Sequence, residues 1–263
     1  MRFYSIFILS LVFITFSCQD KKATNEQQPV VSQPQKAAIS IPVDLDKILK
    51  RHGSLTVWNQ MQTLSYEIVR EGGNEKQIID LISRNERIEG SNFKTGYNGK
   101  EYWLEADTSY KGNAKFYHNL MFYFYAMPFV LADEGIVYSA TTPLEFEGVS
   151  YPGIKISYNS GVGESPEDEY FIHFDPETHR MKWLGYTVTF FSGEKSEKVK
   201  WIRYNDWKPV KGLLLPKSIT WYKMEGNEIT EPRTPTQFVN IELSEEKTDP
   251  SVFEKTEGAV IVE

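Results

Sequence analysis

The chain has 263 residues, 14% of them aromatic, and a formal net charge of −7 at pH 7. An acidic chain without a basic run is a poor ligand for polyanions, so we expect no nucleic acid among its partners. Its only cysteine is Cys18, which excludes an intramolecular disulfide, a thiolate nucleophile and a cysteine-based zinc site in the folded part.

The first 17 residues predict a cleaved secretory signal peptide. A basic Met1-Arg2 start precedes an almost entirely apolar run over residues 3–16, which has the length of a signal h-region and is too short to span a bilayer. The run ends in Thr15-Phe16-Ser17-Cys18, which resembles a relaxed bacterial lipobox that departs from the strict pattern at Phe16. We expect lipid attachment at Cys18 and hence a membrane anchor. The alternative is an ordinary signal peptide or an inert thiol.

The expected location is the Gram-negative cell envelope, with the chain anchored by lipid in the outer membrane. Asp20, close to the lipobox, is also compatible with retention in the inner membrane. Whether the chain lies on the periplasmic or the surface side is left open by the sequence.

Residues 18–43 predict a flexible tether, because they are rich in Gln, Lys, Asn, Pro, Ala and Ser and have no periodicity. A single folded domain is expected from 44 to 263, a length that one all-β domain can reach. Apolar residues at helical spacing over 45–49 predict a first helix, and Gly53 after it is a candidate C-cap. Ser54 is the candidate N-cap of a second short helical turn over 55–58.

From residue 63 onward the period changes to two, which predicts β-strands. The expected strands are 64–68, 77–82, 93–97, 101–104, 137–138, 151–158, 169–174, 181–191, 198–207, 213–223 and 237–243. Asn98-Gly99 between two of them is a strong hairpin signal. About ten or eleven short strands favour a mainly β fold with a curled or closed antiparallel sheet.

Residues 113–132 interrupt the strand pattern and predict one amphipathic, aromatic helix that Met127-Pro128-Phe129 ends or kinks. Aromatic side chains occur around most of this helix, so it must be covered on most sides. It is either a core helix or a lid over an apolar cavity.

This order of elements resembles the lipoprotein-sorting family called LolA-like and LolB-like, over nearly the whole mature chain. Residues 97–103, 120–129 and 174–179 are also similar to a group of uncharacterised bacterial envelope lipoproteins. The resemblance implies an unclosed, strongly curved β-barrel whose concave apolar face is covered by helices and can receive acyl chains. Since carriers of this type are typically soluble and this chain looks tethered, it favours reception or sensing at a membrane over shuttling.

Seven aromatic residues are the candidate lining of such a cavity, four of them tryptophans on different strands that could converge on one concave face. They are Trp103, Phe122, Tyr125, Phe129, Trp183, Trp201 and Trp221. Ordinary core packing is the alternative for each of them.

The sequence offers little for catalysis. His173 and His179 flank Asp175-Pro176-Glu177 without a standard metal-ligand spacing, and His118 within the aromatic helix is more often a partly buried histidine than a catalyst. No hydrolase motif occurs, although two carboxylates from distant strands would escape such a search.

We therefore expect a non-enzymatic, membrane-anchored protein without a metal or cofactor, which binds a lipid or another apolar or amphipathic ligand. The first alternative is a structural or accessory subunit of an envelope complex, whose concavity its own side chains fill. The second is a hydrolase with non-local acids.

Overall fold

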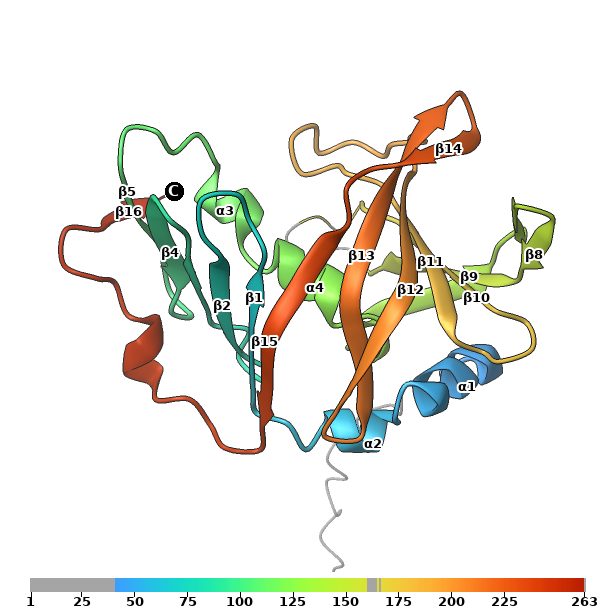
Figure 1. Cartoon of the computed structure of the whole chain (residues 1–263), viewed down its shortest axis with the longest axis horizontal. Helices are drawn as coiled ribbons and strands as arrows, with labels where there is room; N and C mark the ends of the chain where they lie inside the picture. The colour runs from blue at the N-terminus through green and yellow to red at the C-terminus, as the bar shows by residue number, and fades with distance from the viewer. Residues whose placement is uncertain (1–40, 160–164, 166, 263) are drawn as a thin grey trace, which may run out of the picture. The chain divides into compact units, whose positions relative to one another are not determined.

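Antiparallel strands make up most of the computed structural model, which describes residues 41–159, 165 and 167–262 (Figure 1). They belong to one compact unit, Ile39–Glu263. The strands are β1 (Thr63–Ile68), β2 (Glu75–Asp80), β3 (Glu86–Glu89), β4 (Phe93–Tyr97), β5 (Tyr102–Ala106), β6 (Ile136–Ala140), β7 (Leu144–Phe146), β8 (Val149–Tyr151), β9 (Gly153–Tyr158), β10 (Tyr170–Phe174), β11 (Met181–Tyr186), β12 (Lys200–Val210), β13 (Leu213–Glu225), β14 (Glu228–Pro232), β15 (Thr236–Ser244) and β16 (Val260–Val262).

Fourteen of these strands form one sheet. Its order is β16-β5-β4-β3-β2-β1-β15-β13-β12-β11-β10-β9-β6, β14 pairs with β13, and β7 and β8 form a separate hairpin. Among the described strands β16 and β6 are the two edges, so the sheet curves without closing. Register shifts in the β1–β15 and β12–β13 pairs act as bulges, which bend strands and increase their twist.

This architecture confirms the predicted mainly β, half-open sheet. All eleven predicted strand regions contain strands, and the structure adds β3, β7, β8, β14 and β16. These five are among the shorter strands, with three to five residues each, and a short strand gives only a weak pattern of alternation. The predicted β4–β5 hairpin is also present, and the Asn98 side chain accepts hydrogen bonds from the backbone N–H groups of Lys100 and Glu101 at 3.0 and 3.1 Å.

Both predicted N-terminal helical segments are confirmed. Helix α1 (Val43–Arg51) buries its apolar face and has acidic residues in its first turn and basic ones in its last, as the helix dipole favours. In α2 (Leu55–Trp58) the Ser54 hydroxyl accepts a bond from the Val57 N–H at 3.4 Å, which makes Ser54 the predicted N-cap.

The prediction of one helix over residues 113–132 is wrong, because the segment divides into three pieces. These are α3 (Ala114–Tyr117), α4 (Leu120–Tyr125) and the 3₁₀ helix η1 (Phe129–Ala132). Asn119 separates the first two with a left-handed φ of 56°, which asparagine tolerates better than most residues. Pro128 precedes the third.

The main core lies between one face of the sheet and the helices α1, α2, α4 and η1. Figure 1 shows α4 against the part of the sheet formed by β12, β13 and β15, with α1 and α2 near one end of these strands. A second 3₁₀ helix, η2 (Pro250–Phe253), packs against β3 and precedes the edge strand β16.

Candidate ligand-binding site

Helices α3 and α4 cover one face of the sheet and enclose the candidate site. Helix α3 begins where the Asn113 side chain accepts a bond from the Phe116 N–H at 2.9 Å, an N-cap contact. Each helix has only four to six residues and would be unstable alone. Their position therefore depends on bonds to the sheet.

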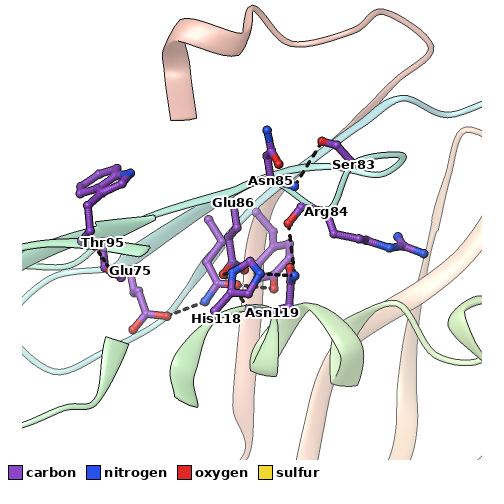
Figure 2. A network of polar contacts seen from close by, with 11 residues as sticks. Glu75, Ser83, Arg84, Asn85, Glu86, Thr95, His118 and Asn119 are labelled. Atoms are coloured by element: carbon purple, nitrogen blue, oxygen red, sulfur yellow. Dashed lines mark hydrogen bonds and ion pairs between the residues drawn. The ribbon is translucent and has the colours of Figure 1, made fainter. Parts of the chain in front are cut away.

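The most buried of these bonds involve Glu86 on β3, whose side chain is only 1% exposed (Figure 2). Its carboxylate accepts a 2.7 Å bond from the Asn119 backbone N–H and lies 3.2 Å from His118 Nδ1. The Asn119 side-chain amide donates to the Arg84 carbonyl at 3.2 Å. The helical break at Asn119 is thus the point at which the helices are attached to the sheet.

A second attachment holds α3 to the neighbouring strand β2. The Tyr117 hydroxyl donates to Glu75 at 2.6 Å and accepts from Arg70 at 3.1 Å. Gln77 donates to the same carboxylate at 2.7 Å. Burial, and then the charge of Glu75, raise the pKa of Tyr117, so its hydroxyl stays protonated and able to donate.

A cavity of about 630 Å³, here called the aromatic cavity, lies between these helices and the sheet. Its apolar wall consists of side chains from α3, α4 and η1 and from the strands that face them. These residues are Tyr97, Tyr102, Phe116, Leu120, Met121, Tyr123, Phe124, Val130, Tyr158, Tyr170, Tyr186, Val188, Phe190 and Trp221. Burial raises the pKa of both Tyr158 and Tyr170, so these phenols add no negative charge to the wall.

A second cavity of about 1200 Å³, here called the basic cavity, adjoins the first. It is lined by parts of β12 and β13, the segment before β12 and the segment between β14 and β15. Its charged residues are Arg70, Glu197, Lys198, Lys200, Lys223 and Arg233. The two cavities share four lining residues, which are Met121, Tyr186, Lys200 and Trp221. We therefore treat them as two parts of one site.

Tyr186 and Trp221 define the junction between the cavities. The Trp221 indole Nε1 donates to the Tyr186 hydroxyl at 2.9 Å. The Phe124 ring lies 4.9 Å from the Tyr186 ring and 5.6 Å from the Trp221 ring. Lys200 stands directly opposite Tyr186 in the β11–β12 pair, which places both side chains on the same face of the sheet.

The acidic residues at the aromatic cavity have structural partners. Asp168 accepts from both the N–H and the hydroxyl of Thr189, at 2.7 and 2.8 Å. Asp133 forms a 2.8 Å ion pair with Arg84. Burial raises the pKa of each carboxyl, and the bonds from Thr189 and the charge of Arg84 oppose that shift. In this structure both acids are thus held by contacts within the fold.

Three of the predicted lining residues are core residues. Phe122, Tyr125 and Phe129 are each 0% exposed. Tyr125 stacks on Tyr66 at 4.3 Å and Phe129 on Trp58 at 4.8 Å. They do not line the aromatic cavity.

The four tryptophans do not converge on one face. Trp221 faces Phe124 and lines both cavities, and Trp201 lines the basic cavity from opposite Gly185. Trp183 packs against Phe146 of the β7–β8 hairpin, at 4.8 Å.

Trp103 is also remote from the cavities. Its indole Nε1 donates to the Phe253 carbonyl of η2 at 2.9 Å, and its neighbour Tyr102 faces His118. Neighbouring residues of a strand point to opposite faces, so Trp103 packs on the face away from α3 and α4.

Sequence reasoning missed the tyrosines and cations of the site. Tyr170 and Tyr186 form a cross-strand pair, and Tyr158 lies on the next strand. Their strands were predicted, but a tyrosine on a strand resembles any other half-buried aromatic. Lys200 and Arg233 carried no signal, because only the fold brings them beside Tyr186.

The remaining site predictions concern metals and the lipid anchor. In the described part of the chain, no group of three or more His, Cys, Asp or Glu side chains is placed to hold a metal ion. His173 is buried with Nδ1 3.0 Å from the Tyr151 carbonyl, and His179 stacks on Phe174 at 5.5 Å. Cys18 lies outside the described residues. No described helix is both long enough and apolar enough to cross a membrane.

Comparisons with known proteins give a family model and several solved structures. Residues 89–208 match the model of a family of unknown function, DUF6503. The chain is similar to a LolA superfamily protein from Nitrosomonas europaea, with 9% identity, a TM-score of 0.48, and coverage of 81% of this chain and 99% of that one.

Two further solved structures are similar. A DUF1329 family protein from Desulfovibrio piger has 12% identity and a TM-score of 0.47, with coverage of 80% of this chain and 95% of that one. An outer membrane lipoprotein-sorting protein domain from Vibrio parahaemolyticus has 5% identity and a TM-score of 0.38, with coverage of 76% and 91%. The LolA-like lipoprotein-sorting family that the sequence resembles is thus represented among these similar structures. No curated protein matches the chain.

Proposed function

We propose that this chain is a lipid-anchored protein of the bacterial cell envelope that binds an apolar or amphipathic ligand, such as an acyl chain, without chemical turnover. The observation that carries the proposal is the aromatic cavity of about 630 Å³ between the α3–α4 helices and the sheet. Small-molecule sites have volumes of about 300–1000 Å³ and mostly apolar walls with a few polar groups.

The construction of the cavity supports binding over simple core packing. Tyr123, Tyr158 and Tyr170 line it without being fully buried, whereas the core behind it contains rings that are 0% exposed, such as Phe122 and Tyr125. A ligand that covers the cavity walls would gain about 25 cal/mol for each Å² of apolar surface removed from water.

The anchor and the location are further parts of the proposal. Lipid on Cys18 and a tether over residues 18–43 would hold the domain near a membrane, which is also the source of an apolar ligand. We place it in the outer membrane of a Gram-negative envelope, where it would receive or sense a ligand at the membrane.

Native mass spectrometry tests the proposal. The mature chain, residues 18–263 with Cys18→Ser so that any lipid measured is not covalent, is purified without detergent and weighed before and after addition of long-chain fatty acid. Leu120→Trp, in the cavity wall, is expected to reduce the bound fraction by filling the space. Ile82→Trp, an exposed position outside both cavities, is the matched control. A clean mass without uptake by the folded wild type would overturn the proposal.

An accessory subunit of an envelope complex is the second candidate. The edge strand β16 supports it, because Val260 and Ile261 are 61% and 56% exposed. An exposed apolar edge strand can pair with a strand of another chain. Loss of a co-purifying envelope protein in a Val260→Lys, Ile261→Lys variant, with unchanged lipid uptake, would favour this candidate.

A further inference from the structure

We propose that the basic cavity selects a ligand with an anionic head group, whose apolar tail occupies the aromatic cavity. This inference rests on the proposed function and names its ligand class. The head group would be a carboxylate or a phosphate attached to an acyl chain, and Lys200, Arg233 and Tyr186 would bind it.

The first observation is the charge of the basic cavity. The chain as a whole is acidic, with a net charge of −7, yet five cations and a single carboxylate, Glu197, line this cavity in the described structure. The cationic wall of this cavity attracts anions, whereas the net negative charge of the rest of the chain repels them.

The second observation is that three of these cations are available. Arg70 pairs with Glu75 at 3.6 Å and Lys223 with Glu231 at 2.9 Å. In the described part of the chain, no ion pair joins Lys198, Lys200 or Arg233 to a carboxylate. Their charges can therefore be neutralised by a ligand without breaking an existing pair.

The third observation is the polar junction between the cavities. Because the Tyr186 hydroxyl accepts from Trp221, it retains its own proton for donation to an anion. Lys200 stands opposite Tyr186 across the β11–β12 pair and lines both cavities. An ammonium and a hydroxyl donor thus lie together where a tail would leave the aromatic cavity.

Arg233 lies near the same hydroxyl. Its backbone N–H donates to the Trp221 carbonyl at 2.8 Å, which fixes the segment after β14 against β13. Burial raises the pKa of Tyr186, and the charge of Arg233 opposes that rise, which reflects the proximity of the two side chains. Arg233, Lys200 and Tyr186 thus line the same cavity.

The distribution of acids gives the ligand a direction. Asp133, Glu134 and Asp168 line the aromatic cavity, whereas the cations other than Lys115 and Lys200 line the basic cavity only. An anionic head group would meet unpaired cations at the basic cavity, and carboxyl groups with few cations at the aromatic cavity. The tail consequently enters the aromatic cavity and the head remains beside Lys200 and Arg233.

The test compares two ligands with the same hydrocarbon tail, oleic acid as its ionised carboxylate and oleyl alcohol. Their binding to the mature protein, residues 18–263 with Cys18→Ser, is measured by calorimetry. We expect the carboxylate to bind about tenfold more tightly at low salt, as one charge-assisted contact provides. The preference should shrink as salt is added, because exposed charges are screened. Lys200→Glu and Arg233→Glu should each abolish it.

Lys208→Glu is the matched control, since Lys208 is also exposed and on β12 but lines neither cavity. Lys208→Glu should retain the tenfold preference. Inorganic phosphate, which has no apolar tail, should not displace the carboxylate ligand from the wild type. Equal affinity for both ligands in the wild type would overturn the inference while leaving the proposed function intact. An equal loss of preference in Lys208→Glu would also overturn it, and failure of both ligands to bind would overturn the proposed function as well.

Discussion

The backbone N–H of Asn119 donates a 2.7 Å hydrogen bond to the buried Glu86 carboxylate, and this bond joins the α3–α4 junction to strand β3. Glu86→Ala would leave that N–H without its acceptor and remove the partner of His118. We expect the free energy of unfolding to fall by about 2–4 kcal/mol, measured by urea denaturation.

Two further variants separate the bond from its surroundings. Glu86→Gln retains a carbonyl acceptor and should lose less than half as much stability. Glu89→Ala, on the same strand but in a half-exposed ion pair with Arg87, should lose at most about 1 kcal/mol. If all three variants unfold at the wild-type urea concentration, Glu86 does not attach the helices.

The next prediction concerns the bond that holds α4 to β12. The Tyr204 hydroxyl donates to the Phe124 carbonyl at 2.7 Å, and both residues are buried. Tyr204→Phe leaves that carbonyl without its partner and without water, so we expect a loss of about 1–3 kcal/mol in thermal or urea unfolding.

Tyr138→Phe is a control with the same geometry in a wetter place. The Tyr138 hydroxyl donates to the Leu131 carbonyl, also at 2.7 Å, but the residue is only partly buried. Water can replace this donor, so the loss should be smaller than for Tyr204→Phe. The reverse order would show that burial does not set the cost.

We expect a Gly→Ala substitution to cost much more stability at Gly53, in the turn between α1 and α2, than at an open turn. Its φ is +109°, and a Cβ added there would lie 2.2 Å from the Gly212 carbonyl oxygen. Gly53→Ala should cost more than about 3 kcal/mol, because the left-handed conformation and the clash both oppose it. Gly72→Ala has a φ of +85° and nothing within 4 Å of the added Cβ, so only about 1–2 kcal/mol is expected. Similar unfolding midpoints for the two variants would contradict this account.

Local patterns predicted much of the fold. Ser54 at its cap, the alternation of β1 and the Asn98-Gly99 hairpin each depend on neighbours in the sequence, and each is present. Many such strands with short turns favoured a curled or closed antiparallel sheet, and the resemblance to the LolA-like family implied that it is unclosed. Sequence patterns were sufficient for the cap, the strand and the hairpin because interactions between residues close in the sequence select these conformations.

The break at Asn119 was not predictable from the same rules. The aromatic pattern over residues 113–132 is helical, and the bond that stabilises the left-handed residue comes from Glu86, 33 residues earlier. Strand β3 was missed for a related reason, since Glu86 is a charged residue at a buried strand position.

The candidate site depends on the same long-range pairing. Trp103 and Trp221 are alike as sequence features, yet alternation within their strands places one against η2 and the other in the cavities. A shift of one residue in strand register reverses which face a side chain occupies. The suggestion that all four tryptophans could converge on one concave face therefore failed, because the sequence does not show the register of their strands.

His52 predicts that stability depends on pH. Its ring lies between β11 and β13 and is 0% exposed, with Nε2 3.1 Å from the Met181 N–H and Nδ1 3.2 Å from the Leu214 carbonyl. The first contact requires a neutral Nε2 acceptor, so the proton is assigned to Nδ1, which donates to Leu214. Burial lowers the pKa of His52 from its ordinary value of 6.5 to about 4.

The sign of the effect follows from proton binding. The unfolded chain takes up a proton on His52 near pH 6.5, whereas the folded chain does so only near pH 4. Between these values the unfolded state binds more protons, so the free energy of unfolding falls as the pH falls, by up to about 3 kcal/mol. The contribution is fully present above pH 6.5.

Urea denaturation across this range, for the wild type and His52→Gln, measures the effect. Glutamine offers one acceptor and one donor and does not titrate, so the variant should lose most of the slope between pH 6.5 and 4. Burial also lowers the pKa of His173, which both proteins retain, and the difference between the two curves isolates His52. Parallel curves for the two proteins would mean that His52 accepts its proton as readily in the folded chain as in the unfolded one, and that the Met181 and Leu214 contacts do not hold it neutral.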